Sequence, residues 1–95
     1  MREYEVLFII DPTLDEEAKD AQIEKVKGVI AEGGEVLDVD VWGNRRLAYE
    51  INKKKDGFYV LITFNAGADL PKELDRRLRI ADNIMRHITV CHDEK

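Results

Sequence analysis

Two hydrophobic periodicities alternate along this 95-residue chain in an order that few folds accommodate. Runs rich in β-branched and aromatic residues, typical of strands, occupy residues 4–10, 36–51, 58–65 and 84–91. Two segments with apolar residues at helical spacing lie between them, at residues 14–32 and 70–81. The sequence therefore predicts the element order β-α-β-β-α-β. The near-continuous apolar run of the first strand predicts a central place in a sheet.

Capping signals predict where the helices begin and end. Thr13 precedes Glu16 by three residues, the spacing of a capping box, so Thr13 is expected to cap the first helix. The pair Gly33-Gly34 is expected to end that helix in the left-handed conformation. Asp69 or a neighbour is expected to cap the second helix.

The second extended segment is expected to bend and then to turn back on itself. Gly43-Asn44 interrupts a strand pattern that continues beyond it, which indicates a bulge. Residues 52–57 end in Asp56-Gly57, a strong hairpin signal, and are expected to form the turn. The third strand is therefore antiparallel to the second.

This element order predicts an α+β, ferredoxin-like fold. Two split β-α-β units with right-handed crossovers give a four-stranded antiparallel sheet with both helices on one face. The chain length fits a single domain spanning residues 1–95. Because the second face of the sheet is left uncovered, we expect function on that open face, at its edges or in the loops.

Strand alternation predicts which side chains reach the open face. With Val60 directed toward the helices, Tyr59 faces outward. In the last strand, Ile88 and Val90 have the character of core residues, which directs His87 to the open face. An uncovered face that mixes apolar and polar groups is typical of a partner surface.

Charge narrows the classes of function. The net charge of −5 argues against a general nucleic-acid binder, because phosphate contacts require Lys and Arg. The charge is uneven, however: residues 1–44 carry −8 and residues 45–95 carry +3, so a locally basic surface is compatible with an acidic whole. No apolar run or leader pattern predicts a membrane span or secretion, and a single cysteine excludes an internal disulfide.

No residue pattern points to catalysis, a metal or a cofactor. The sequence lacks a nucleophile elbow, a phosphate-cradling P-loop and a zinc-protease helix motif. His87 and Cys91 share a face of one strand but lie about 13 Å apart, too far to hold one ion. Small acyl phosphate hydrolases of similar topology need a phosphate-binding loop after the first strand, where this chain has Asp11-Pro12. We therefore expect no enzyme, metal site, cofactor or small-molecule substrate.

The basic residues are more informative. Arg45-Arg46 follows a predicted bend and lies beside Trp42, a combination that suits phosphate or nucleic-acid backbone recognition. An exposed Tyr59 adds a stacking surface for an unpaired base. The arginines of the second helix are explained equally well as a solvated face paired with nearby carboxylates: Arg76, Arg77 and Arg79 lie close to Glu73 and Asp75.

Three segments together resemble one family. The first is residues 42–51, Trp-Gly-Asn-Arg-Arg-Leu-Ala-Tyr-Glu-Ile, followed by Asp56-Gly57-Phe58-Tyr59. The second is the opening Met1-Arg2-x-Tyr4-Glu5-Val6, with Asp11-Pro12 after the strand. The third is Leu78-Arg79-Ile80-x-Asp82-Asn83-Ile84-x-Arg86-His87. In order and length, the whole chain resembles the bacterial small-subunit ribosomal protein S6 family.

The resemblance implies a non-catalytic, RNA-binding component of the small ribosomal subunit in the cytoplasm. Members of the family pair with the small basic ribosomal protein S18, and the pair binds the central domain of small-subunit ribosomal RNA. A basic partner would explain how an acidic protein can bind RNA, because that partner supplies positive charge and meets the acidic surface.

The resemblance and the basic pattern together select the RNA-contact candidates, which are Arg2, Arg45, Arg46, Tyr59, Arg79, Arg86 and His87. The alternative function is a homodimeric regulatory domain of the same fold that senses a small metabolite. That alternative requires a stable homodimer and a pocket lined by glycine.

Overall fold

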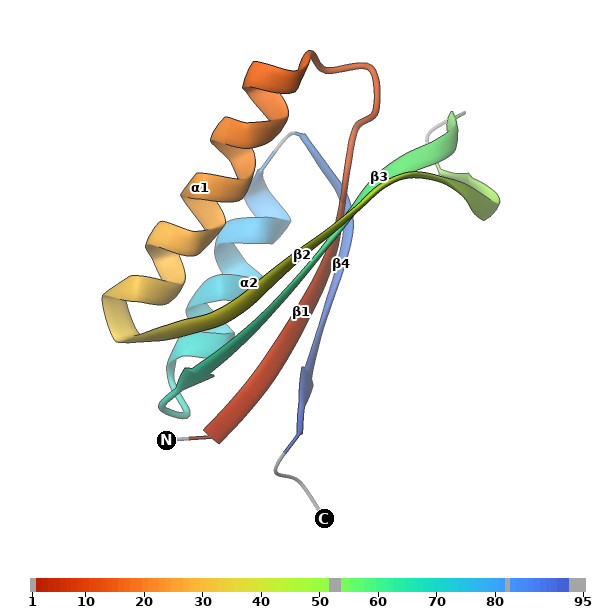
Figure 1. Ribbon diagram of the computed structural model, residues 1–95. Coiled ribbons are helices and arrows are strands. Elements are labelled where there is room, and N and C mark those ends of the chain that lie inside the picture. The colour runs from red at the N-terminus through yellow and green to blue at the C-terminus, as the bar shows by residue number, and fades with distance from the viewer. Residues whose placement is uncertain (1, 52–53, 82, 93–95) are drawn as a thin grey trace.

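The computed structural model describes residues 2–51, 54–81 and 83–92 and has the predicted element order (Figure 1). Its elements are β1 (Arg2–Ile10), α1 (Glu16–Gly33), β2 (Gly34–Ile51), β3 (Lys54–Ala66), α2 (Leu70–Ile80) and β4 (Ile84–Cys91). The strands form one sheet in the order β2-β3-β1-β4, with every neighbouring pair antiparallel. Figure 1 shows both helices on the same side of this sheet. The predicted ferredoxin-like fold is confirmed, as is the central position of β1.

The core lies between the sheet and the two helices. Its fully buried sheet residues alternate along the two central strands and are Val6, Phe8, Ile10, Val60, Ile62 and Phe64. The helices cover them with one apolar side chain per turn or so, namely Ile23, Val26, Val29, Ile30, Leu70, Leu74 and Leu78. Alternation thus assigned the faces of Val60 and Tyr59 in β3 correctly.

In β4 the face assignment was wrong. Ile88 is 57% exposed and Val90 is 46% exposed, whereas His87 lies on the helix side. The pairing with β1 explains this, because His87 lies opposite the core residue Phe8. Its ring Nε2 lies 2.7 Å from Oδ1 of Asp75 on α2, so a polar contact between β4 and α2 replaces the expected apolar one.

The first helix begins and ends differently from the sequence prediction. Asp15, not Thr13, is the N-cap, and its Oδ1 accepts a hydrogen bond of 2.8 Å from the backbone N–H of Ala18. Thr13 instead donates to the carboxylate of Asp11 through both its N–H and its hydroxyl. Gly34 is extended, not left-handed, and is the first residue of β2. A Cβ at Gly34 would overlap the backbone oxygen of a residue in β3, so close strand approach explains this glycine.

The predicted bulge is confirmed, but the hairpin is longer than the sequence indicated. Gly43 has a φ of +83°, and the pairing of β2 with β3 shifts register there. Asp56 and Gly57 are paired strand residues, opposite Arg46 and Arg45, and do not form the turn. Of the predicted turn, residues 52–53 lie outside the described residues. Figure 1 shows this hairpin projecting beyond the rest of the sheet.

A small apolar cluster anchors the hairpin on the open face. Ile9 of β1 is only 7% exposed although no helix covers it, and Leu47 of β2 is 9% exposed. Both pack over Gly57, where a Cβ would overlap Cγ2 of Ile9 and approach Cδ2 of Leu47 to 3.3 Å. The absence of a side chain at Gly57 therefore lets the hairpin lie against β1.

We predict that Gly57→Ala lowers the free energy of unfolding by about 1–3 kcal/mol, because Ile9 must move out of its packed position. The matched control is Gly28→Ala on the exposed side of α1, where an added Cβ meets nothing within 4 Å. That change is expected to stabilise the protein by about 0.5–1 kcal/mol. Urea unfolding followed by circular dichroism measures both. A Gly57→Ala variant as stable as the parent would contradict the packing described above.

The contact between α2 and β4 predicts a pH dependence of stability. The hydrogen bond from His87 is the main cause that lowers the pKa of Asp75, with a smaller contribution from Arg79. A carboxylate with a lowered folded pKa stabilises the protein above its unfolded value of about 4, and that contribution is lost as the pH falls through the lower, folded value.

We therefore expect Asp75→Asn to destabilise the protein at pH 7 and to matter progressively less below about pH 4. Urea unfolding at a series of pH values measures the difference in free energy. Asp69→Asn is the control, because Asp69 is the N-cap residue that precedes the same helix and its carboxylate accepts no capping hydrogen bond. A difference for Asp75→Asn that stays constant with pH would show that its charge contributes nothing.

Candidate nucleic-acid interface

An arginine and two aromatic rings are stacked on the open face of the sheet. The rings of Trp42 and Tyr59 lie 5.9 Å apart between centroids and are tilted by only 9°. The guanidinium carbon of Arg45 lies 5.3 Å from the centre of the Trp42 ring. We call Arg45, Trp42 and Tyr59 the open-face stack. Trp42 remains 38% exposed, so the stack is accessible to a ligand.

The bulge at Gly43 places these groups together. Because the register of β2 and β3 shifts between Val41 and Gly43, Arg45 lies opposite Gly57 on the open face, where Trp42 already stands beside Tyr59. The indole Nε1–H of Trp42 donates a hydrogen bond of 3.0 Å to Oδ2 of Asp40, which fixes the ring orientation. A strand without the bulge would place Arg45 opposite Asp56, on the other face.

The stack continues across the sheet toward β4. Tyr59 is paired with Ile9 of β1, and Ile9 is paired with Arg86 of β4. Arg86 is exposed and shares the open face with Ile9, two strands and about 10 Å from Tyr59. The row of Tyr59, Ile9 and Arg86 therefore continues the open-face stack, so that Arg45 and Arg86 lie on either side of aromatic and aliphatic surface.

The other sequence candidates lie apart from this row. Arg46 is the neighbour of Arg45 in the hairpin and is exposed, with Asp56 as its strand partner. Arg2 begins β1 at the other end of the sheet, seven residues and about 23 Å from Ile9.

Arg79 and His87 both contact Asp75 on the helix side. Arg45, Tyr59 and Arg86 thus share one face, Arg46 is close to them, and Arg2, Arg79 and His87 are not part of the same surface.

Sequence reasoning missed two contributors to this surface. Trp42 was noted only as a neighbour of Arg45, and Ile9 was not among the candidates. The signal for Trp42 was strand alternation, because Trp42 follows Asp40 by two residues and shares its face. For Ile9 no local signal existed, since its burial depends on Gly57 from a distant strand.

The opposite end of the open face is acidic. Glu3 and Glu5 of β1 lie here, and Asp38 of β2 is paired with Thr63 of β3 on the same face. His92 contacts both glutamates, with Nδ1 3.2 Å from Glu3 and Nε2 3.3 Å from Glu5. The hydrogen bond to Glu5 is the main cause that raises the pKa of His92. We call Glu3, Glu5 and Asp38 the acidic end.

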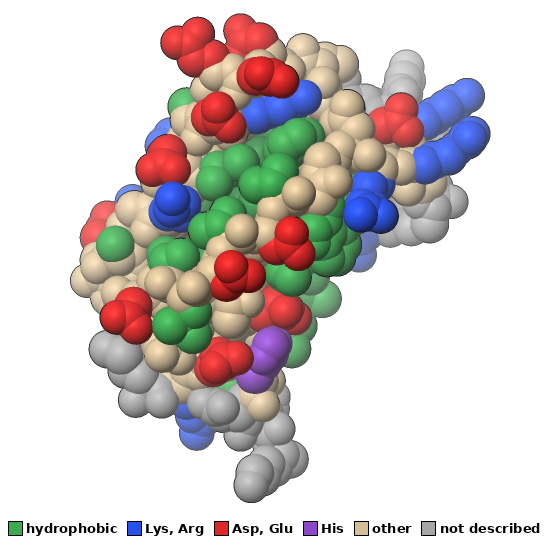
Figure 2. All heavy atoms as spheres, viewed as in Figure 1, with side chains coloured by type: hydrophobic (Ala, Val, Ile, Leu, Met, Phe, Trp, Pro, Cys, Tyr) green, Lys and Arg blue, Asp and Glu red, His purple; other side chains and the backbone are tan. Residues whose placement is uncertain are grey.

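Charge is therefore separated along the molecule. Figure 2 shows Lys and Arg side chains gathered at the projecting hairpin, whereas most Asp and Glu side chains in this view lie over α1 and β2. Between the two ends of the open face lie apolar side chains of three strands, which are Leu7, Leu61, Ile88 and Val90. This pattern suits an anionic ligand at the hairpin end and a cationic one at the acidic end.

Within residues 2–51, 54–81 and 83–92, no three His, Cys, Asp or Glu side chains are grouped so as to hold a metal ion. Among the same residues, no helix has the length and apolar character that crossing a membrane requires.

Comparison with known proteins identifies the family of this chain. A family model described as Ribosomal protein S6 matches residues 3–91. A small ribosomal subunit protein bS6 from Clostridium kluyveri is 58% identical over 96 residues, covering 100% of both chains. A bS6 from Clostridium botulinum is 52% identical over 94 residues, covering 98% of this chain and 100% of the relative.

A solved structure gives the same result for the fold. The crystal structure of 30S ribosomal protein S6 from Thermotoga maritima superposes with a TM-score of 0.92 at 35% sequence identity, covering 96% of this chain and 87% of the other. The family consists of structural, non-enzymatic ribosomal components, which confirms the expectation that the chain is not an enzyme. With a family model across almost its whole length and relatives more than half identical, the chain belongs to the ribosomal protein S6 family.

Proposed function

We propose that this chain is a structural constituent of the small ribosomal subunit that binds the central domain of small-subunit ribosomal RNA together with ribosomal protein S18. Its place in the subunit is supported by the relatives, which are named small ribosomal subunit proteins. The observation that carries the RNA contact is the open-face stack, in which Arg45, Trp42 and Tyr59 are held in contact on an uncovered sheet.

The chemistry of the stack fits RNA. Aromatic rings on a sheet surface stack unpaired bases of any sequence, and a guanidinium beside them binds phosphate or stacks on a base. Arg46 and Arg86 provide further cations that the same RNA strand can reach. Arg2, Arg79 and His87 are weaker candidates, because Arg2 is remote and the other two are engaged with Asp75.

The charge distribution supports a second, basic protein in the complex. A chain of net charge −5 has few cations to offset phosphate repulsion. The acidic end and the apolar strip beside it offer complementary surface for a basic protein, and S18 is the partner that we propose. Steering between opposite charges would also make formation of the pair sensitive to salt.

We predict that this protein alone binds a central-domain RNA fragment weakly and that S18 strengthens binding cooperatively. A gel-shift titration with and without S18, at two salt concentrations, measures this. Binding that weakens steeply with salt and requires S18 is the expected result. Absence of RNA binding in both cases, with both proteins folded, would refute the proposal and would direct attention to the alternative metabolite-sensing function.

We predict that Arg45→Gln weakens the ternary complex by about tenfold, because a charge-assisted contact to phosphate or base is lost. The salt slope should fall by about 0.7–0.9, the contribution of one phosphate contact. The matched control is Arg76→Gln, which removes the same charge from α2, where Arg76 contacts Glu73 on the other side of the molecule. Equal effects of the two variants in the same gel-shift assay would show that only net charge matters.

A further inference from the structure

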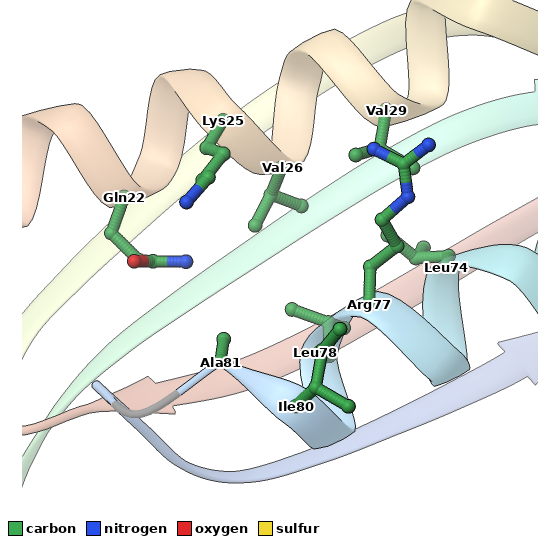
Figure 3. A pocket seen from close by; sticks show the side chains of 9 residues that line it. All are labelled: Gln22, Lys25, Val26, Val29, Leu74, Arg77, Leu78, Ile80 and Ala81. Atoms are coloured by element: carbon green, nitrogen blue, oxygen red, sulfur yellow. The ribbon is translucent and has the colours of Figure 1, made fainter.

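A cleft on the helix side of the molecule is not explained by RNA binding. It lies between α1 and α2 and has a volume of about 210 Å³ (Figure 3). Its floor is apolar and consists of Val26, Val29, Leu74 and Leu78, which are the core-facing residues of the two helices. The volume lies below the roughly 300–1,000 Å³ of most small-molecule sites. The cleft thus suits a single large side chain better than a cofactor.

A nearly buried amide faces this cleft. Gln22 of α1 is only 9% exposed, and Figure 3 shows its side-chain amide pointing into the space between the helices. Among the residues that the structure describes, this amide has no hydrogen-bond partner. The amide is not among the fully buried polar groups without a partner, so its donor and acceptor atoms are open to a hydrogen-bonding group of a ligand that enters the cleft.

The rim of the cleft favours a negative charge. Lys25 follows Gln22 by one turn and lines the same cleft, with no ion pair to any described residue. The other cation on the rim, Arg77, is already engaged, with Nε 2.9 Å from Glu73 and a terminal nitrogen 3.6 Å from Glu32. Lys25 is therefore the charge available to a ligand, and with Gln22 it forms a pair of donors suited to a carboxylate.

The far wall of the cleft offers unused apolar surface. Ile80, at the end of α2, is 66% exposed, the largest exposure among the large apolar side chains that the structure describes as exposed. It stands beside the apolar floor in Figure 3. An aliphatic group that enters the cleft would remove both its own apolar surface and that of Ile80 from water. The burial of both surfaces strengthens binding.

We propose that this cleft binds a peptide segment of a partner protein through one large aliphatic side chain and an adjacent carboxylate. The aliphatic side chain enters between Val26 and Leu78, against Ile80. The carboxylate accepts hydrogen bonds from Lys25 and Gln22. The cleft lies on the opposite side of the sheet from the open-face stack, so a peptide and RNA would bind independently. The proposal consequently does not rest on the proposed RNA contact.

The test is a titration of the ¹⁵N-labelled full chain with an acetylated, amidated tetrapeptide of sequence Ala-Leu-Asp-Ala, followed by NMR. We expect affinity in the range of about 1 mM, since one side chain and one exposed charge pair are gained. The side-chain amide of Gln22 and the backbone signals of Val26 and Leu78 should shift together. The indole signal of Trp42 should not move, which makes it an internal control on the other face.

Matched peptides and variants identify the contacts. Replacing the leucine of the peptide by alanine should weaken binding by at least about tenfold, and replacing the aspartate by lysine should weaken it several-fold. Lys25→Glu should weaken binding about threefold or more, whereas Lys27→Glu, which changes the same charge on α1 outside the cleft, should not.

Three results would overturn the proposal. The first is the absence of shifts at the cleft at several millimolar peptide. The second is equal affinity for the aspartate and lysine peptides. The third is equal effects of Lys25→Glu and Lys27→Glu, which would reveal non-specific attraction between charges.

Discussion

The antiparallel pairing of β1 with β3 determines the rest of this molecule. The two strands run side by side over nine paired positions, from Arg2 opposite Ala66 to Ile10 opposite Phe58. Since paired residues share a face, every second pair must enter the core beneath the helices and the intervening pairs must face outward. A single register therefore sets both the core and the chemical character of the open face.

That constraint explains what could be predicted from the sequence. Where a strand is central and covered, hydrophobic alternation is unambiguous, as the full burial of Val60 and Phe64 shows. At the edge of the sheet the same rule fails, because the uncovered face of β4 also carries apolar side chains, Ile88 and Val90. The pattern in β4 then carries little information about its face. The polar contact between His87 and Asp75, which depends on a helix twelve residues earlier, could not be inferred from that pattern.

The capping and turn signals in the sequence also failed where contacts with other residues decide the local structure. Asp15 takes the role expected for Thr13, because two capping residues stand close together and Asp11 holds the threonine away from the helix. Asp56-Gly57 resembles a turn in isolation but is held in a strand by Ile9 packing over the glycine. In the candidate site, the basic hairpin and Tyr59 were predictable from composition and alternation. The place of Arg45 beside Trp42 depends on the bulge at Gly43, which the sequence indicated only as a break in the pattern.

The junction between α1 and β2 limits how sequences of this fold can vary in length. The helix ends at Gly33 and the strand begins at Gly34, so no connecting residue separates them. Inserting or deleting one residue there would shift every side chain of β2 to the opposite face and expel Val36 and Val39 from the helix side. The connections after Ile10 and Ala66 contain residues of their own and absorb such changes locally. Variation in length should therefore collect in those connections and spare the helix–strand junction.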